Sequence, residues 1–374
     1  MKKLLLLTFL FLLCACTNKY KELGYSPKAV KIINSLSKKD QVFFSEYDNN
    51  LSLILDNDSF DVENFDNYRM FCKFLDADLV VGLVNDGTIS SSNYGLVKSL
   101  SKIDNFDGSK LKEYISLSKD IKDRQTVVYL VNNNISFDTK TVNELIKDKA
   151  YIYKNIENYL KYQKDKETIR ELVEYVNTLN YLKYYEDNFY ADPDKYGVEV
   201  LVNKFYYLGE NYVPDDLVEL GTLGYGSLRK VAYVAYVEMV EAAKKDGVSF
   251  YVTSSYRSYE TQVKIYNRYL LIDPQEKVDT YSARPGFSDH QTGYTVDILK
   301  SGYDFGNFYT TDASKWLAKN AHKYGFICRY PEGLEQATGY EYEPWHYRYV
   351  GDIATKVYES GLSYDEFFAK YIED

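Results

Sequence analysis

The histidines of this chain are few enough to be considered one by one. Of the three, His290 stands seven residues before Asp297, with Gly293 between them, and His346 stands three residues after Glu343. A catalytic zinc ion takes three protein ligands, from imidazole or carboxylate groups, and keeps a fourth position for water. His290, Asp297 and His346 form such a set if a turn at Gly293 leads into a strand, and Glu343 can then act as general base toward the activated water. The alternative is that both histidines are hydrogen-bonded structural residues, the commoner role of an isolated histidine.

The third histidine lacks such neighbours. His322 falls off the apolar stripe of a helix that the sequence predicts from Ala313 to Tyr324. We therefore expect a surface histidine with no part in a metal site.

The segments around the two other histidines resemble a known family. Ser288-x-His290-x-x-Gly293-x-Thr295-x-Asp297 and Glu343-x-Trp345-His346 are similar to the signature segments of the D-alanyl-D-alanine carboxypeptidase and dipeptidase family. These zinc peptidases are related to those of vancomycin resistance and, in fold, to lysostaphin and hedgehog. Further similar stretches, which extend the resemblance to about residues 198–352, are Leu201-Val202-Asn203-Lys204, Tyr212-Val213-Pro214-Asp215-Asp216-Leu217, Ser255-Tyr256-Arg257-Ser258 with Gln262, Pro285-Gly286-Phe287-Ser288 and Thr338-Gly339-Tyr340.

The chain departs from the family pattern at two positions. Thr295 stands where the family usually has alanine, and Asp289 stands where it usually has glutamate. Neither change removes a ligand, so we expect them to affect only details of substrate fit.

The resemblance implies a zinc-dependent carboxypeptidase, with one ion, that removes C-terminal D-alanine from peptidoglycan stem peptides. It implies that Arg257 stabilises the oxyanion on the scissile carbonyl, a role that suits a guanidinium, and that Gln262 and Ser288 hold the C-terminal end of the substrate. A surface ion pair is the alternative for Arg257. D,D- and L,D-carboxypeptidase specificity both stay open, as does another class of function, a catalytically weak cell-wall-binding lipoprotein that uses this fold for recognition.

The elements that must position these residues follow from the pattern after residue 190. The sequence predicts a helix capped by Ser227 and ended at Gly247, a strand over residues 248–253, and a helix from Tyr259 to about Leu270 capped by Ser258. Asp312 is expected to cap the helix that begins at Ala313. Together with the resemblance, this pattern favours an α+β zinc peptidase domain over residues 195–374, with a small antiparallel sheet flanked by helices.

A repeat region precedes this domain. The dipeptide Val-Asn ends at Asn85, Asn132 and Asn177, at spacings of 47 and 45 residues, and a tyrosine precedes each asparagine by 17 or 18 residues. Those tyrosines, Tyr68, Tyr114 and Tyr159, each follow an aromatic residue (Phe60, Phe106 or Tyr151) by eight positions. We predict three helix pairs of about 45 residues within residues 16–190. A spacer or wall-binding arm and a purely structural duplication are both open.

The N-terminus predicts export. Lys2 and Lys3 precede an apolar run that ends at Leu13, and Cys16 follows a small residue, a pattern typical of a lipoprotein signal peptide over residues 1–15 with lipid attached to Cys16. The body would then be extracytoplasmic and anchored to the bacterial membrane only through this lipid. Of the other cysteines, Cys14 leaves with the signal, and Cys72 and Cys328 are expected to be buried and unpaired.

The net charge argues against one class of partner. The formal charge is −10, and no basic run occurs in the chain. The sequence therefore offers no electrostatic footprint for nucleic acid.

Overall fold

The computed structural model describes residues 19–373 as two compact units, one ending at Asn143 and the other beginning at Glu144. The predicted signal peptide and Cys16 lie outside the described residues. Within residues 19–373, none of the helices has both the length and the apolar character required to cross a membrane.

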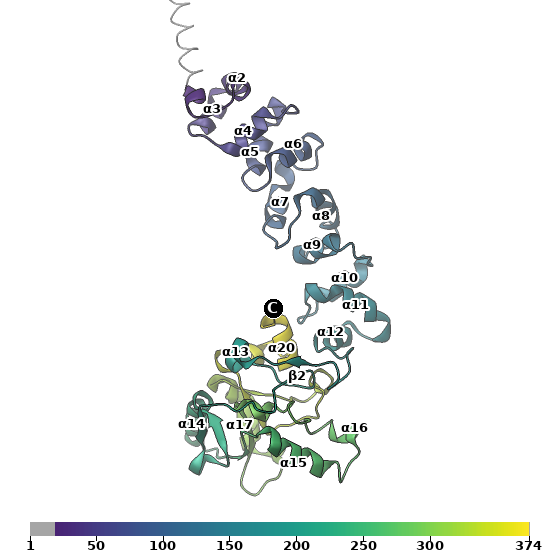
Figure 1. Ribbon diagram of the computed structural model, residues 1–374, viewed down its shortest axis with the longest axis vertical. Coiled ribbons are helices and arrows are strands. Elements are labelled where there is room, and N and C mark those ends of the chain that lie inside the picture. The colour runs from purple at the N-terminus through teal and green to yellow at the C-terminus, as the bar shows by residue number, and fades with distance from the viewer. Residues whose placement is uncertain (1–18, 374) are drawn as a thin grey trace, which may run out of the picture. The chain divides into compact units, whose positions relative to one another are not determined.

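The first unit is helical (Figure 1). Its helices are α2 (Pro27–Ser35), α3 (Lys38–Gln41), α4 (Asn49–Asp56), α5 (Phe65–Phe71), α6 (Ala77–Asn85), α7 (Tyr94–Leu100), α8 (Leu111–Leu117) and α9 (Arg124–Asn132). Two of the three predicted repeats, each marked by a tyrosine and an asparagine, fall on the helix pairs α5–α6 and α8–α9. The third falls on α11 (Ile156–Tyr162) and α12 (Ile169–Asn177), which belong to the second unit.

The repeated tyrosine and asparagine make the same contacts in all three helix pairs. In α8–α9, the Tyr114 hydroxyl donates to Asn132 Oδ1 at 2.5 Å and accepts from the Asp107 amide at 3.3 Å, while Asn132 Nδ2 donates to the Asn105 carbonyl at 2.7 Å. Tyr68 with Asn85, and Tyr159 with Asn177, repeat this arrangement. Because a buried tyrosine hydroxyl needs a partner, the tyrosine and asparagine are needed together in each repeat.

A four-stranded sheet lies at the centre of the second unit. Its order is β5 (Tyr251–Ser254), β6 (Thr295–Leu299), β8 (His346–Tyr349) and β7 (Phe326–Cys328), with all neighbours antiparallel, as the fold prediction required. Helices α14 (Lys230–Lys245) and α17 (Asp312–Asn320) contribute Tyr236, Met239 and Leu317 to the core beneath it. A mixed α+β fold is therefore confirmed.

Smaller elements complete this unit. They are the parallel pair β1 (Phe189–Tyr190) and β2 (Tyr206–Tyr207), the antiparallel pair β3 (Leu217–Glu219) and β4 (Ser227–Arg229), and the helices α13 (Pro193–Tyr196), α15 (Tyr259–Tyr269), α16 (Gln275–Val278), α18 (Glu335–Thr338), α19 (Ala354–Ser360) and α20 (Tyr364–Tyr371).

The structure confirms one of the three predicted helix caps. Ser258 caps α15 by accepting the Thr261 amide, as predicted, but Ser227 is not a helix cap because it pairs with Glu219 in the β3–β4 ladder. The cap of α17 is Thr311, one residue before the predicted Asp312. The strand predicted from residue 248 begins only at Tyr251.

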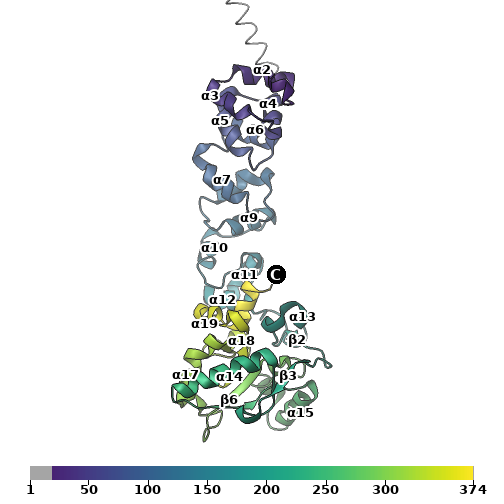
Figure 2. The same cartoon turned by 90° about the vertical axis from the view of Figure 1, so that its left-hand side faces the viewer.

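The third helix pair packs on the C-terminal helices within the second unit, where α12 contacts α20 and α18 (Figure 2). Arg170 of α12 pairs with the buried Glu366 of α20, and its guanidinium also lies 2.8 Å from Asp148. Lys149 donates to the carbonyls of Ser360 and Gly361. This repeat therefore shares polar and charged contacts with the sheet-containing part of the chain.

The two cysteines of the described chain are unpaired, as predicted, but only Cys72 is buried as expected, whereas Cys328 is partly buried. Burial raises the pKa of the Cys72 thiol to about 11 and that of the Cys328 thiol to about 12. Neither thiol is therefore a nucleophile near neutral pH.

Candidate metal centre

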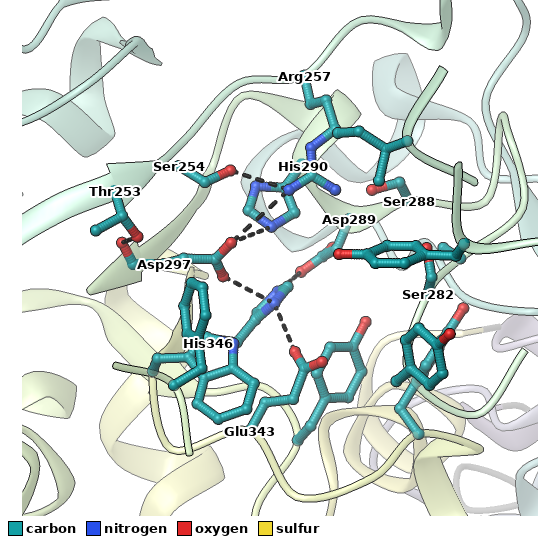
Figure 3. Close-up of a pocket in the computed structure, with 18 of the residues that line it drawn as sticks. Thr253, Ser254, Arg257, Ser282, Ser288, Asp289, His290, Asp297, Glu343 and His346 are labelled. Carbon is teal, nitrogen blue, oxygen red and sulfur yellow. Dashed lines mark hydrogen bonds and ion pairs between the residues drawn. The ribbon is translucent and has the colours of Figure 1, made fainter. Parts of the chain in front are cut away.

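Three local structures converge on one point. His290 lies on a 3₁₀ turn (Asp289–Thr292), Gly293 ends that turn with a φ of +74°, and β6 then carries Asp297 into the sheet. In the sheet, Asp297 is the register partner of His346, the first residue of β8. Ligand atoms of His290, Asp297 and His346 all lie within 4.8 Å of one another, and all three side chains are buried (Figure 3).

Gly293 cannot readily be replaced. A Cβ atom at this position would lie 2.9 Å from Arg229 Cγ and 3.1 Å from Pro214 Cγ, and the left-handed backbone already disfavours other residues. The tight turn between the first two predicted ligands therefore requires glycine.

The hydrogen bonds around His290 fit a metal ligand. Its Nδ1 lies 2.8 Å from the Ser255 carbonyl, which can only accept, so Nδ1 carries the proton. The lone pair of Nε2 then faces Asp297 Oδ2 at 3.2 Å. Because both groups are acceptors, a cation between them would satisfy both.

The second histidine has a similar environment. His346 Nδ1 lies 3.4 Å from Asp297 Oδ1, an atom that is buried and has no hydrogen-bond partner within the described residues, and Nε2 faces Asp289 Oδ2 at 3.6 Å. Two imidazoles and one carboxylate form a donor set that suits zinc. The residues present therefore fit the ion.

Glu343 stands beside the candidate ligands. Its Oε2 lies 3.1 Å from His346 Nδ1, and burial raises the pKa of this carboxyl. Burial also raises the pKa of Asp297, but His290, His346 and Arg257 outweigh that effect and bring the value to about 2. The two carboxyls therefore differ in pKa. Asp297 stays ionised, whereas Glu343 has the greater affinity for a proton, which is the property of a general base.

Arg257 reaches the same site from the segment between β5 and α15. Its guanidinium donates to Ser254 Oγ at 2.9 Å and to Gln262 Oε1 at 2.8 Å, and it lies 3.8 Å from Asp297 Oδ2. The Gln262 amide is fully engaged, because its Nε2 donates to the Ala283 carbonyl at 2.6 Å. The Gln262 side chain therefore holds Arg257 in place, whereas Ser288 lines the cavity.

Sequence reasoning missed the role of Asp289. We expected it to affect substrate fit, but its side chain is buried, pairs with the buried Arg348 and faces His346. Although burial opposes ionisation, Arg348, Arg329 and His346 hold the pKa of Asp289 well below its usual range. An ionised Asp289 can fix the ring of His346, so that Nδ1 faces the metal position. The position next to His290 was the only signal in the sequence.

A cavity of about 520 Å³ opens over these groups. Figure 3 shows Arg257, Ser288, Glu343 and the two histidines around it. His322 lies elsewhere, stacked on Tyr358 at 4.0 Å between ring centroids and partly buried, so it is less exposed than predicted and plays no part in the site. The cavity therefore opens directly onto the candidate metal position.

Comparisons with known proteins agree with this geometry. Residues 226–352 match the VanY family, described as D-alanyl-D-alanine carboxypeptidase. The Bacillus subtilis (strain 168) protein YodJ is 41% identical over 181 residues, which are 46% of this chain and 66% of YodJ. The D-alanyl-D-alanine carboxypeptidase of Enterococcus faecalis is 35% identical over 200 residues, 49% of this chain and 71% of that enzyme.

Among solved structures, VanYB in complex with D-alanine-D-alanine is 33% identical, with a TM-score of 0.41 over 47% of this chain and 99% of VanYB. The family match over residues 226–352 covers the four-stranded sheet, the cavity lining and all three candidate ligands. This chain belongs to the D-alanyl-D-alanine carboxypeptidase family of zinc peptidases.

Proposed function

We propose that this protein is a zinc carboxypeptidase that removes C-terminal D-alanine from peptidoglycan stem peptides. The observation that carries the proposal is the convergence of His290, Asp297 and His346, whose acceptor atoms face one point with Glu343 beside it. Family membership supports the same reaction. The relative VanYB, which binds D-alanine-D-alanine, supports the substrate class.

The side chains at the site have different roles in the reaction. His290, Asp297 and His346 would hold the zinc ion, which would supply Lewis-acid activation of water and of the peptide carbonyl. Glu343 accepts the proton of the attacking water on its carboxylate and returns it to the leaving amine.

Arg257 offers a fixed positive charge to the carbonyl oxygen as negative charge develops there. Gln262 and Ser254 hold the guanidinium in place, so its orientation does not have to be gained during the reaction. Ser288, on the cavity wall, contacts the C-terminal end of the substrate.

Mass spectrometry of stem peptides incubated with the purified, zinc-loaded protein tests this function. The expected result is release of one alanine from a pentapeptide, a tetrapeptide or both, which also decides between D,D- and L,D-specificity. Full zinc occupancy with no alanine released from either peptide would contradict the proposal.

We further propose that Cys16 carries a lipid that anchors the protein outside the cytoplasm, and that the helix pairs before residue 190 act as a spacer between this anchor and the catalytic domain at 195–374. The lipoprotein pattern and the repeated tyrosine–asparagine contacts support this arrangement. Cys16→Ala should move the protein from the membrane fraction to the medium or leave uncleaved precursor. Unchanged membrane partition of mature protein would count against the anchor.

A further inference from the structure

One wall of the cavity has no part in the chemistry described above. It is built from Ile265, Arg268 and Tyr269 of α15 and from Tyr281 in the segment after α16. The rings of Tyr269 and Tyr281 meet edge to face at 5.2 Å, and the Tyr281 hydroxyl donates to Asp273 at 2.8 Å. Because Asp273 already binds the Tyr281 hydroxyl, the two packed rings present a largely apolar surface to the cavity.

Arg268 is the cation of this wall. Its side chain is exposed at the end of α15, and it makes no side-chain hydrogen bond or ion pair with any residue between 19 and 373. The other arginine that lines the cavity, Arg257, is held by Ser254 and Gln262. Arg268 therefore keeps all its donors available to a ligand.

The acidic groups of the cavity lie elsewhere. Asp289, Asp297 and Glu343 gather at the metal centre, where each lies within 3.6 Å of His346. Arginine presents a planar fork of donors that matches a carboxylate. A free guanidinium beside an apolar wall therefore suits a substrate group that joins an aliphatic stem to a carboxylate.

We propose that Arg268, with the wall of Ile265, Tyr269 and Tyr281, forms a subsite for a carboxylate of the substrate. This inference rests on the proposed carboxypeptidase function and narrows its substrate to peptides with a correctly placed anionic group. That group is either the C-terminal carboxylate of the leaving residue or a carboxylate on the side chain of a residue before it. Both present the same chemistry to Arg268.

Steady-state kinetics of Arg268→Gln on matched peptides test the subsite. One pair of D-alanine-terminated peptides differs only in the side chain before the D-alanine, acidic in one and uncharged but of similar length in the other. The second pair differs only in its C-terminus, a free acid or an amide. Lys264→Gln is the control, because Lys264 is exposed on the same helix but does not line the cavity.

The expected result is a loss of about 5- to 50-fold in kcat/KM for the peptide that carries the relevant carboxylate, because hydrogen bonds to charged groups are the stronger ones and this site is open to solvent. The loss should lie mainly in KM, and Arg268→Lys should recover part of it. The uncharged partner of that pair should be cleaved equally by wild type and variant. The pair that loses its discrimination identifies which carboxylate Arg268 binds.

Two results distinguish a failure of the Arg268 subsite from a failure of the proposed carboxypeptidase function. If wild type cleaves the peptides but Arg268→Gln discriminates within both pairs as wild type does, the subsite is refuted and the carboxypeptidase function stands. If wild type cleaves none of the peptides despite bound zinc, the proposed function itself fails. An equal loss in Lys264→Gln would also overturn the inference, since it would reflect the overall charge of the helix.

Discussion

Replacing Arg170 by alanine should destabilise the second unit, because Arg170 is shared by three carboxylates. Glu366 has a side chain that is 1% exposed, while Asp148 and Glu174 are 10% and 13% exposed. Breaking a buried ion pair costs roughly 3–5 kcal/mol, because it leaves a buried charge without a partner. Arg170 itself is 34% exposed, so we expect a smaller loss of about 2–4 kcal/mol in the free energy of unfolding.

This loss should be visible in thermal unfolding. The second unit has about 230 residues, and an unfolding entropy of about 2.1 cal/mol/K per residue converts about 2–4 kcal/mol into a decrease of roughly 4–8 °C in Tm. Burial raises the pKa of the Glu174 carboxyl, and the charge of Arg170 opposes that rise. Without Arg170, folded Glu174 should take up a proton at a higher pH, so the deficit of the variant should shrink as the pH falls from 7 toward 5.

Differential scanning calorimetry of the full chain at both pH values is the assay. Lys154→Ala, an exposed change in the same repeat, is the control and should melt like wild type. Adding Glu366→Gln to Arg170→Ala should restore part of the stability, because the amide removes the stranded charge and keeps a polar group at the start of α20. A Tm within about 1 °C of wild type for Arg170→Ala would show that these ion pairs do not stabilise the second unit.

The remaining predictions concern the metal and the thiols. His290→Ala and His346→Ala should each abolish zinc retention, because each removes one of three ligands, whereas His322→Ala should keep both zinc and turnover; zinc analysis by mass spectrometry after gel filtration checks this, and a zinc content that depends on His322 would overturn the assignment. Cys72 and Cys328 should resist iodoacetamide at pH 8 in folded protein, because burial raises the thiol pKa to about 11 for Cys72 and to about 12 for Cys328. Both should react once the chain is unfolded, and labelling of native protein at either site would contradict these raised pKa values.

The metal residues could be predicted because their signals are local. His290, Gly293 and Asp297 fall within eight consecutive residues, and Glu343 precedes His346 by three, so one turn and two strands are enough to bring them together. The helix caps at Ser258 and the left-handed glycine after residue 292 have equally local causes. Such features need little knowledge of the rest of the fold.

The features that escaped prediction depend on partners far away in the sequence. Ser227 looks like a helix cap until Glu219 of β3, eight residues earlier, pairs with it in a strand ladder. Asp289 acquires its role only when Arg348, 59 residues away, is buried against it. Gln262 could be recognised as an orienting residue only once the Ala283 carbonyl was seen to occupy its amide.

The proposed mechanism requires that Glu343 is a general base beside a zinc ion held by three other side chains. Measuring zinc content, Tm and turnover of D-alanine release for Glu343→Gln tests it most directly. We predict that this variant keeps its zinc and its Tm, because the amide has nearly the same shape, while kcat falls by at least about 100-fold through loss of proton acceptance, with little change in KM. A variant that retains both zinc and near-normal turnover would contradict the account.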